Sequence, residues 1–213
     1  MFDNFCVYLD AGHGAIDPQG NYVTAPGKMY QHSRGTFHQG STFYEGVWNR
    51  RLTNLVAYKL EKLGITYKFL HHDYLDYSLP YRADTANWYH LNYKKGIVIS
   101  NHANASGVGT ARGFEVYTTP GVTPSDTLAE LLWQQVTLLL SDHIRLRPDL
   151  RDQDHDKEAR FYILRKTLMP AMLVEHLFFD NFEDAQLLMH DFIVDMFAEA
   201  QVRAIIQFAA TQR

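Results

Sequence analysis

One short stretch limits the possible folds of this chain more than any other. Residues 96–100 read Gly-Ile-Val-Ile-Ser, a continuous apolar run, whereas a strand with one face in water alternates apolar and polar residues. A continuous run of this kind is typical of a strand buried on both faces. It therefore favours an α/β architecture, in which helices cover both sides of a sheet.

The rest of the chain alternates short β-rich runs with longer helical ones. We predict strands at residues 5–10, 67–70, 96–100, 114–118, 161–164 and 171–175, and helices at residues 45–63, 81–91, 124–144 and 191–208. In the first of these helices the apolar residues recur at steps of three, four and seven, which places them on one buried face. We expect a single domain with a twisted, mostly parallel or mixed sheet of about six strands and helices on both faces.

Two segments fall outside this alternation. Residues 14–44 are rich in Gly, His, Gln, Ser and Thr and form a far longer connection than is usual in compact domains. Because loops of that length tend to be functional, we expect this one to lie over the active site. Residues 145–160 are charged and mostly aperiodic, which indicates a surface loop.

Composition and charge exclude several classes of function. With 213 residues, 46% of them hydrophobic and 21% charged, the chain can bury one sizeable core. A net charge of −4 with mixed signs provides no basic stripe, so nucleic acid is not an expected partner. No run of about 18 apolar residues is present, so no membrane insertion is expected. A single cysteine, Cys6, excludes an internal disulfide and reads as a small buried thiol without a role.

The first residues do not have the form of a signal peptide. They carry an acid, Asp3, where a signal peptide has a basic region, and a predicted core strand begins almost at once. We expect synthesis in the cytoplasm, followed by release through lysis or a non-classical export route.

Two polar residues stand where predicted elements begin or end. His13 lies between glycines directly after the first strand, where its ring can face a cleft at the carboxyl end of that strand. A histidine between glycines is nonetheless more often a turn residue than a ligand. Glu45 opens the first long helix on its inward side, and its simplest role is to complement the positive end of the helix dipole.

A third polar residue makes this pattern more specific. His102 follows the most hydrophobic predicted strand, and α/β sheets place their sites at the carboxyl ends of strands. Together, His13, Glu45 and His102 would supply two imidazoles and a carboxylate, the ligand set of a catalytic zinc ion with one position left for water.

A second carboxylate ends another apolar strand. Glu175 closes the run at residues 171–175, and a glutamate beside a zinc-bound water can take its proton and pass it to a leaving nitrogen. By position alone, a salt bridge between Glu175 and an arginine such as Arg82 is equally compatible with the sequence.

Six motifs, in order, resemble the zinc-dependent N-acetylmuramoyl-L-alanine amidases of the amidase 3 type, which include cell-division amidases, sporulation amidases and phage endolysins. The resemblance covers nearly the whole chain. The matching residues are Asp10 to Gly14; Glu45 with Asn49; Leu79, Arg82, Ala86 and Asn87; Ser100 to Ala105; Gly113 to Tyr117; and Pro170 to Glu175 followed by Asn181.

The resemblance implies a site, a cofactor and a substrate. It implies that His13, Glu45 and His102 bind Zn²⁺, that Glu175 is the catalytic carboxylate, and that the amide between N-acetylmuramic acid and L-alanine in peptidoglycan is cleaved. Residues 1–213 are then expected to form one zinc amidase catalytic domain that acts on the cell wall as a monomer, without a separate wall-binding module.

The chain departs from the family pattern at two places. Leu177, preceded by His176, stands where the family usually has a small residue or glycine, and the connection at residues 14–44 is longer than the family's usual one. Neither departure removes a ligand.

Two other functions are considered. His155 and Glu158 have the His-x-x-Glu spacing of zinc carboxypeptidases, but no buried strand leads into them. The chain could also be a non-catalytic peptidoglycan-binding or regulatory module, although all four proposed catalytic positions carry competent residues.

Overall fold

A six-stranded sheet runs through the middle of the computed structural model, which describes residues 2, 4–151 and 153–211. Neighbouring strands are parallel except β6 and β8, which are antiparallel. The expected mostly parallel, six-stranded sheet is therefore confirmed. In order across the sheet the strands are β4 (Thr66–Phe69), β1 (Phe5–Ala11), β5 (Lys95–Asn104), β8 (Ala171–Phe178), β6 (Glu115–Thr118) and β7 (Lys157–Glu158).

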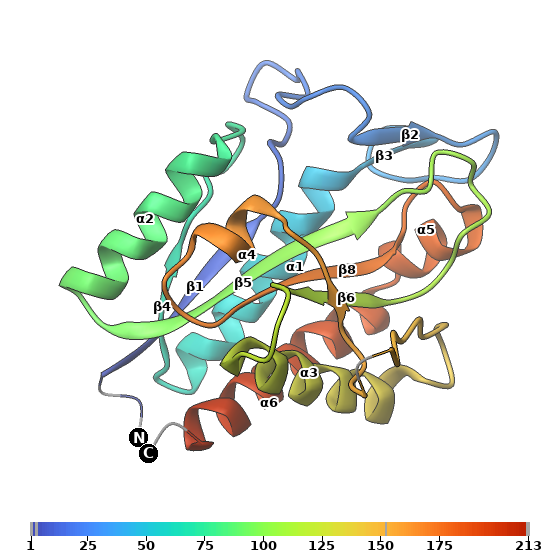
Figure 1. The fold of residues 1–213 in the computed structure, drawn as a ribbon. Helices are drawn as coiled ribbons and strands as arrows, with labels where there is room; N and C mark the ends of the chain where they lie inside the picture. Colours follow the sequence, from blue (N-terminus) through green and yellow to red (C-terminus); the bar gives the residue numbers. More distant parts are fainter. Residues whose placement is uncertain (1, 3, 152, 212–213) are drawn as a thin grey trace.

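Helices cover both faces of this sheet (Figure 1). One face carries α1 (Glu45–Lys62), α3 (Pro124–Leu140) and α6 (Asp191–Thr211), and the other carries α2 (Leu79–Asn92) and α4 (Tyr162–Lys166). A further helix, α5 (Phe182–Met189), follows β8. This arrangement confirms the expected α/β domain.

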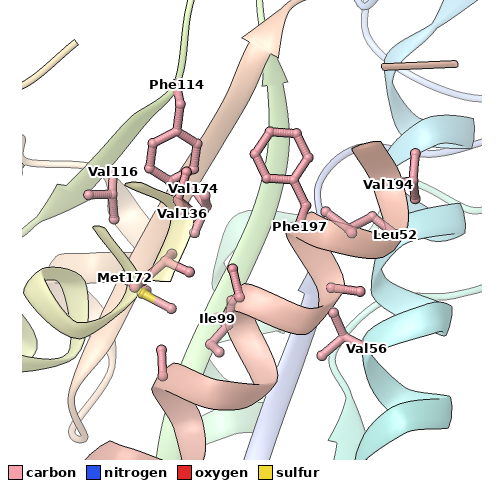
Figure 2. Close-up of a cluster of buried hydrophobic side chains, with 14 of the residues drawn as sticks. Leu52, Val56, Ile99, Phe114, Val116, Val136, Met172, Val174, Val194 and Phe197 are labelled. Atoms are coloured by element: carbon pink, nitrogen blue, oxygen red, sulfur yellow. The ribbon is translucent and has the colours of Figure 1, made fainter. Parts of the chain in front are cut away.

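The apolar run in β5 is explained by these two layers. Ile97 and Ile99 pack into the core beneath α1, α3 and α6, whereas Val98 packs into the smaller core beneath α2 and α4. Figure 2 shows Ile99 among the side chains of the first core, drawn between Met172 of β8 and Val56 of α1. Successive apolar residues of β5 therefore point into two different cores, so this part of the strand is buried on both faces of the sheet.

The strand predicted at residues 161–164 is wrong, because the structure has the short helix α4 there. Ile163 and Leu164 are both buried in the same core, whereas consecutive residues of a strand point to opposite faces. A four-residue apolar run does not distinguish the two by periodicity.

Several boundaries also differ from the sequence-based expectations. Helix α3 ends at Leu140 rather than near residue 144, and α5 was not predicted. The segment 145–160 is not only surface loop, since it contributes β7 and the buried Asp156. Residues 14–44 contain a two-stranded hairpin of β2 (Met29–Gln31) and β3 (Thr42–Tyr44).

None of the helices among the described residues combines the length and the apolar character needed to cross a membrane.

Candidate metal centre and active site

Three side chains that are distant in sequence meet at the carboxyl edge of the sheet. His13 follows β1, His102 lies near the end of β5, and Glu45 is the first residue of α1. Glu45 Oε1 lies 3.3 Å from His13 Nε2 and 3.1 Å from His102 Nδ1. One ligand atom from each residue lies within 4.8 Å of the others. The structure thus brings together the three residues that the sequence singled out as ligands.

The spacing of these atoms fits a zinc ion. Tetrahedral zinc with bonds of about 2.0–2.1 Å to nitrogen and oxygen separates its ligand atoms by about 3.3 Å. The distances from Glu45 Oε1 to the two imidazole nitrogens, 3.3 and 3.1 Å, agree with that geometry. Two imidazoles and one carboxylate also leave a coordination position open, as catalytic zinc sites do.

Glu45 is held as a carboxylate within this group. The residue is only 2% exposed, and burial alone would raise its pKa. Hydrogen bonds with His102 and His13 outweigh that effect and lower the pKa of Glu45 to about 2. Glu45 is therefore ionised at neutral pH.

The backbone of His13 is fixed by two buried arginines. His13 has φ of 64°, a left-handed conformation that is uncommon outside glycine. Its carbonyl oxygen accepts hydrogen bonds from Arg50 Nη2 at 2.8 Å and from Arg82 Nη2 at 3.2 Å. Arg50 Nη1 also donates to the carbonyl of Gly46, beside Glu45, at 2.9 Å. The guanidinium of Arg50 therefore links the backbone of His13 to the backbone beside Glu45, two of the three candidate ligands.

The position of His102 is fixed from both sides. A Cβ at Gly12 would lie 2.0 Å from the His102 ring, so only glycine leaves room for the ring there. The carbonyl of His102 accepts a hydrogen bond from His176 Nδ1 at 3.0 Å, and Gln201 Nε2 lies 3.0 Å from His176 Nε2. Burial lowers the pKa of His176 to about 3, so its ring is neutral. The departure at His176 and Leu177 is thus accommodated in the core, where both are buried.

Arg82 does not pair with Glu175. It forms a buried ion pair with Asp10 and a second, 3.1 Å long, with Asp76. Asp10 also accepts a hydrogen bond from Ser100 Oγ at 2.7 Å. The salt bridge considered for Glu175 is therefore wrong, and Arg82 stabilises the turn that follows β1.

Glu175 lies beside His102 in the register of β8 and β5. Its Oε2 is buried and has no hydrogen-bond partner among the described residues. Burial raises the pKa of Glu175 to about 8, and the negative charges of Glu45 and Glu115 act in the same direction. A carboxyl group with this environment can hold a proton near neutral pH.

A cavity of about 510 Å³ opens onto these groups. Besides His13, His102 and Glu175 it is lined by Lys28 from the 14–44 segment. That segment therefore contributes Lys28 to the wall of this cavity. Apolar and aromatic side chains from α4 and from the start of α2 form another wall, namely Tyr77, Leu79, Phe161, Tyr162 and Ile163.

The alternative histidine motif lies elsewhere and is engaged in other contacts. His155 Nδ1 is 2.8 Å from Glu130 Oε2, and its ring stacks on Trp133. Glu158 accepts a hydrogen bond from the backbone of Gly121. Among the described residues, the one group able to hold a metal ion is His13, Glu45 and His102, so the carboxypeptidase-like reading gains no support.

Sequence reasoning missed three residues that support the centre. Arg50 and His176 fix the backbones of ligand residues, as described above. Lys28 Nζ lies 3.8 Å from Glu45 Oε2, and its carbonyl accepts a hydrogen bond from the backbone N–H of Glu45 at 3.0 Å. The sequence marked His176 only as part of a departure from the family pattern, and no pattern marked Arg50 or Lys28.

Comparison with known proteins extends over the whole fold. A family model described as N-acetylmuramoyl-L-alanine amidase, of the amidase 3 type, matches residues 7–207. The chain is 33% identical over 129 residues to the N-acetylmuramoyl-L-alanine amidase CwlM of Bacillus licheniformis, which covers 60% of this chain and 45% of that protein. It is 26% identical over 207 residues to the endolysin of Bacillus phage SPP1, covering 94% of this chain and 65% of the endolysin. The chain thus spans less than two thirds of either relative.

The fold also matches a solved structure. The N-acetylmuramoyl-L-alanine amidase from Clostridium difficile 630 superposes with a TM-score of 0.74 at 23% identity, and the match covers 98% of each chain.

Proposed function

The chain belongs to the N-acetylmuramoyl-L-alanine amidase family of the amidase 3 type, and on this premise we propose that it hydrolyses the amide between N-acetylmuramic acid and L-alanine in peptidoglycan with one zinc ion. The observation that carries the proposal is the meeting of His13, Glu45 and His102 next to the unpartnered carboxyl oxygen of Glu175. The activity belongs at the cell wall, where the substrate lies.

His13, Glu45 and His102 hold the ion, and the atoms that would bind it already lie close together. Glu45 presents Oε1 to both histidines while its Oε2 lies near Lys28. Because imidazole nitrogens ligate only when unprotonated, acid should weaken zinc binding at His13 and His102 and lower the activity. When bound, zinc supplies a Lewis acid that polarises the scissile carbonyl and makes water a stronger acid.

Glu175 moves the proton. Its free Oε2 accepts a proton from the attacking water, and the carboxyl group then donates it to the nitrogen of the departing L-alanine. Burial raises the pKa of Glu175, which makes its carboxylate a stronger base towards the water and lets the carboxyl group keep the proton until the nitrogen takes it. Burial at the cleft keeps bulk water from taking the proton first.

The test separates chemistry from metal binding. We expect Glu175→Ala to retain one zinc per chain but lose cleavage by at least about a hundredfold, since general acid–base catalysis contributes about 10²–10⁴-fold. His102→Ala should lose both zinc and cleavage. Glu158→Ala, in the alternative motif, serves as the matched control and should keep both.

The readouts are metal analysis and mass spectrometry of digested peptidoglycan. A new amine terminus on L-alanine identifies the bond that is cut. Undiminished cleavage by Glu175→Ala would refute the assigned role of that residue, and wall binding with no chelator-sensitive release of fragments would favour a non-catalytic module.

A further inference from the structure

A second cleft, of about 1020 Å³, lies outside the metal centre. The 14–44 segment supplies much of its lining, including Tyr30, His32 and Arg34. The remaining wall comes from the loop after β5 and from the turn between β8 and α5, where Asp180 and Phe182 lie. Figure 1 shows the β2–β3 hairpin beyond the carboxyl end of β5, on the side of α5. The long connection noted in the sequence therefore builds a cleft that the catalytic residues do not use.

Asp180 lines this cleft and carries an unused hydrogen-bond acceptor. The residue is only 4% exposed, and its Oδ2 accepts hydrogen bonds from the backbones of Ser106, Gly107 and Gly109 at 3.0, 2.8 and 3.2 Å. Ser106 Oγ donates to the same oxygen at 3.0 Å. Its Oδ1 is buried and has no partner among the described residues. A buried carboxylate oxygen without a donor is costly, so it favours a ligand that donates a hydrogen bond.

The other polar groups of the cleft complement this acceptor. His32 is 5% exposed, and its Nε2 lies 3.0 Å from the carbonyl oxygen of Phe179. Burial lowers the pKa of His32, so the ring is neutral, Nε2–H is the donor, and Nδ1 is a further acceptor. Arg34 places its guanidinium carbon 4.5 Å from the ring centre of Phe182. The lining thus combines one anion, one cation and a neutral imidazole.

Strand β2 connects this cleft with the metal centre. Lys28, just before β2, lines the catalytic cavity, and His32, just after it, lines the second cleft. The extended chain from Lys28 to His32 spans about 13 Å, which sets the distance between the two sites. An extended tripeptide bound at the metal centre covers about 10 Å of that distance, and a long side chain on its third residue reaches further.

The free edge of β2 can guide such a peptide. Within the described part of the chain, β2 pairs only with β3. The backbones of Lys28 and His32 bond toward β3, through Glu45 and Ser41 respectively. Because alternate residues of an antiparallel strand face opposite edges, Tyr30 also bonds toward β3, whereas Met29 and Gln31 expose their N–H and C=O groups on the unpaired edge. Unpaired edges of this kind bind extended peptides by adding a strand.

We propose that the second cleft is a subsite for the peptide that follows the scissile amide. It selects a residue that carries a primary ammonium group, which donates a hydrogen bond to Asp180 Oδ1. This rests on the proposed amidase function and names part of its substrate. Arg34 pairs with a carboxylate on the same residue, such as the C-terminus of a tripeptide.

Synthetic substrates test the subsite. Two N-acetylmuramoyl tripeptides differ only in the third residue, which is lysine in one and norleucine in the other, so that only the ammonium changes. We expect the zinc-loaded protein to cleave both and to favour lysine about tenfold in kcat/KM. Amidation of the C-terminal carboxylate should lower kcat/KM severalfold, and Arg34→Gln should remove that difference.

Asp180→Asn is the sharpest variant, because its amide oxygen can still accept from Ser106, Gly107 and Gly109 while an NH₂ replaces the free oxygen. We expect the ratio of kcat/KM for the lysine substrate over the norleucine substrate to fall from about ten to about one. Glu183→Gln, an exposed acid nearby, is the control and should keep the preference.

The outcomes separate the two proposals. Equal cleavage of both tripeptides by the wild-type protein overturns the subsite and leaves the amidase function standing, and this comparison holds even if Asp180→Asn does not fold. A lysine preference that survives in a folded Asp180→Asn protein also overturns the subsite. Failure of the zinc-loaded protein to cleave either tripeptide, or peptidoglycan itself, overturns the amidase function on which the subsite rests.

Discussion

At the scale of single residues, the candidate metal centre depends on backbone positions as much as on the proposed ligand side chains. Arg50 is 6% exposed, and its guanidinium donates hydrogen bonds to the backbone carbonyls of four residues, His13, Gly46, His72 and Leu75. Burying a guanidinium is costly unless its donors are satisfied. The hydrogen bonds of Arg50 offset the cost of burying its charge. They also hold the backbones of His13 and Gly46, and so help to position the proposed ligands His13 and Glu45.

This arrangement predicts that Arg50→Lys weakens zinc binding without changing any ligand. A lysine has a single ammonium and cannot reproduce the planar fork that reaches both carbonyls. Loss of such supporting contacts typically costs about 10–100-fold in metal affinity. Competition with a chromophoric chelator measures the affinity, and Arg51→Lys, at a neighbouring half-exposed arginine, should leave it unchanged. Equal affinities in both variants would show that the Arg50 fork is dispensable.

At the scale of elements, the β2–β3 hairpin depends on a neutral histidine. His38 Nδ1 accepts a hydrogen bond from the backbone N–H of Tyr44 at 2.9 Å. Burial lowers the pKa of His38 to about 4, and the charge of Arg51 acts in the same direction. The folded state therefore favours the unprotonated ring, whereas the unfolded chain protonates near pH 6.5.

The sign of the pH effect follows from these two values. The stabilisation from His38 is complete above about pH 6.5 and is lost progressively as the pH falls towards about 4. At pH 5 the loss is on the order of 1–2 kcal/mol. Thermal unfolding at pH 7.5 and pH 5 should show a smaller drop for His38→Asn than for the wild-type protein. An equal drop in the two proteins would contradict this assignment.

Long periodic elements were predictable from the sequence, and short ones were not. The helix from Glu45 and the strand around residues 96–100 have enough residues for their periodicity to be decisive. By contrast, α4 and β7 have five and two residues, and their structure is decided by the neighbours they pack against. The hairpin within residues 14–44 depends on β2 pairing with β3, which no local pattern marks.

Some residues of the candidate site were likewise predictable from the sequence, and others were not. His13, Glu45 and His102 could be proposed because each sits at the end of a predictable element. Arg50 and Lys28 could not, because their roles depend on carbonyl and carboxylate groups brought close only by the fold. The pairing of Arg82 with Asp10 rather than Glu175 is likewise a matter of tertiary geometry.

At the scale of the whole molecule, the proposed zinc ligands tie together three separate elements. His13 follows β1, His102 belongs to β5, and Glu45 begins α1, so an ion held by all three resists the separation of the helix from the sheet. An ion that binds the folded state and not the unfolded one stabilises the fold in proportion to the logarithm of its concentration over Kd.

Zinc should therefore raise the melting temperature of the protein. At a free zinc concentration a thousandfold above Kd the stabilisation is about 4 kcal/mol, which for a chain of this size corresponds to roughly 10 °C. Magnesium, which prefers oxygen ligands in octahedral geometry, should produce no comparable shift. His102→Ala should abolish the zinc-dependent shift, whereas Glu175→Ala should retain it, because Glu175 handles a proton and not the ion. A melting temperature that does not respond to zinc, or one that responds equally in the His102→Ala protein, would place the ion elsewhere or exclude it.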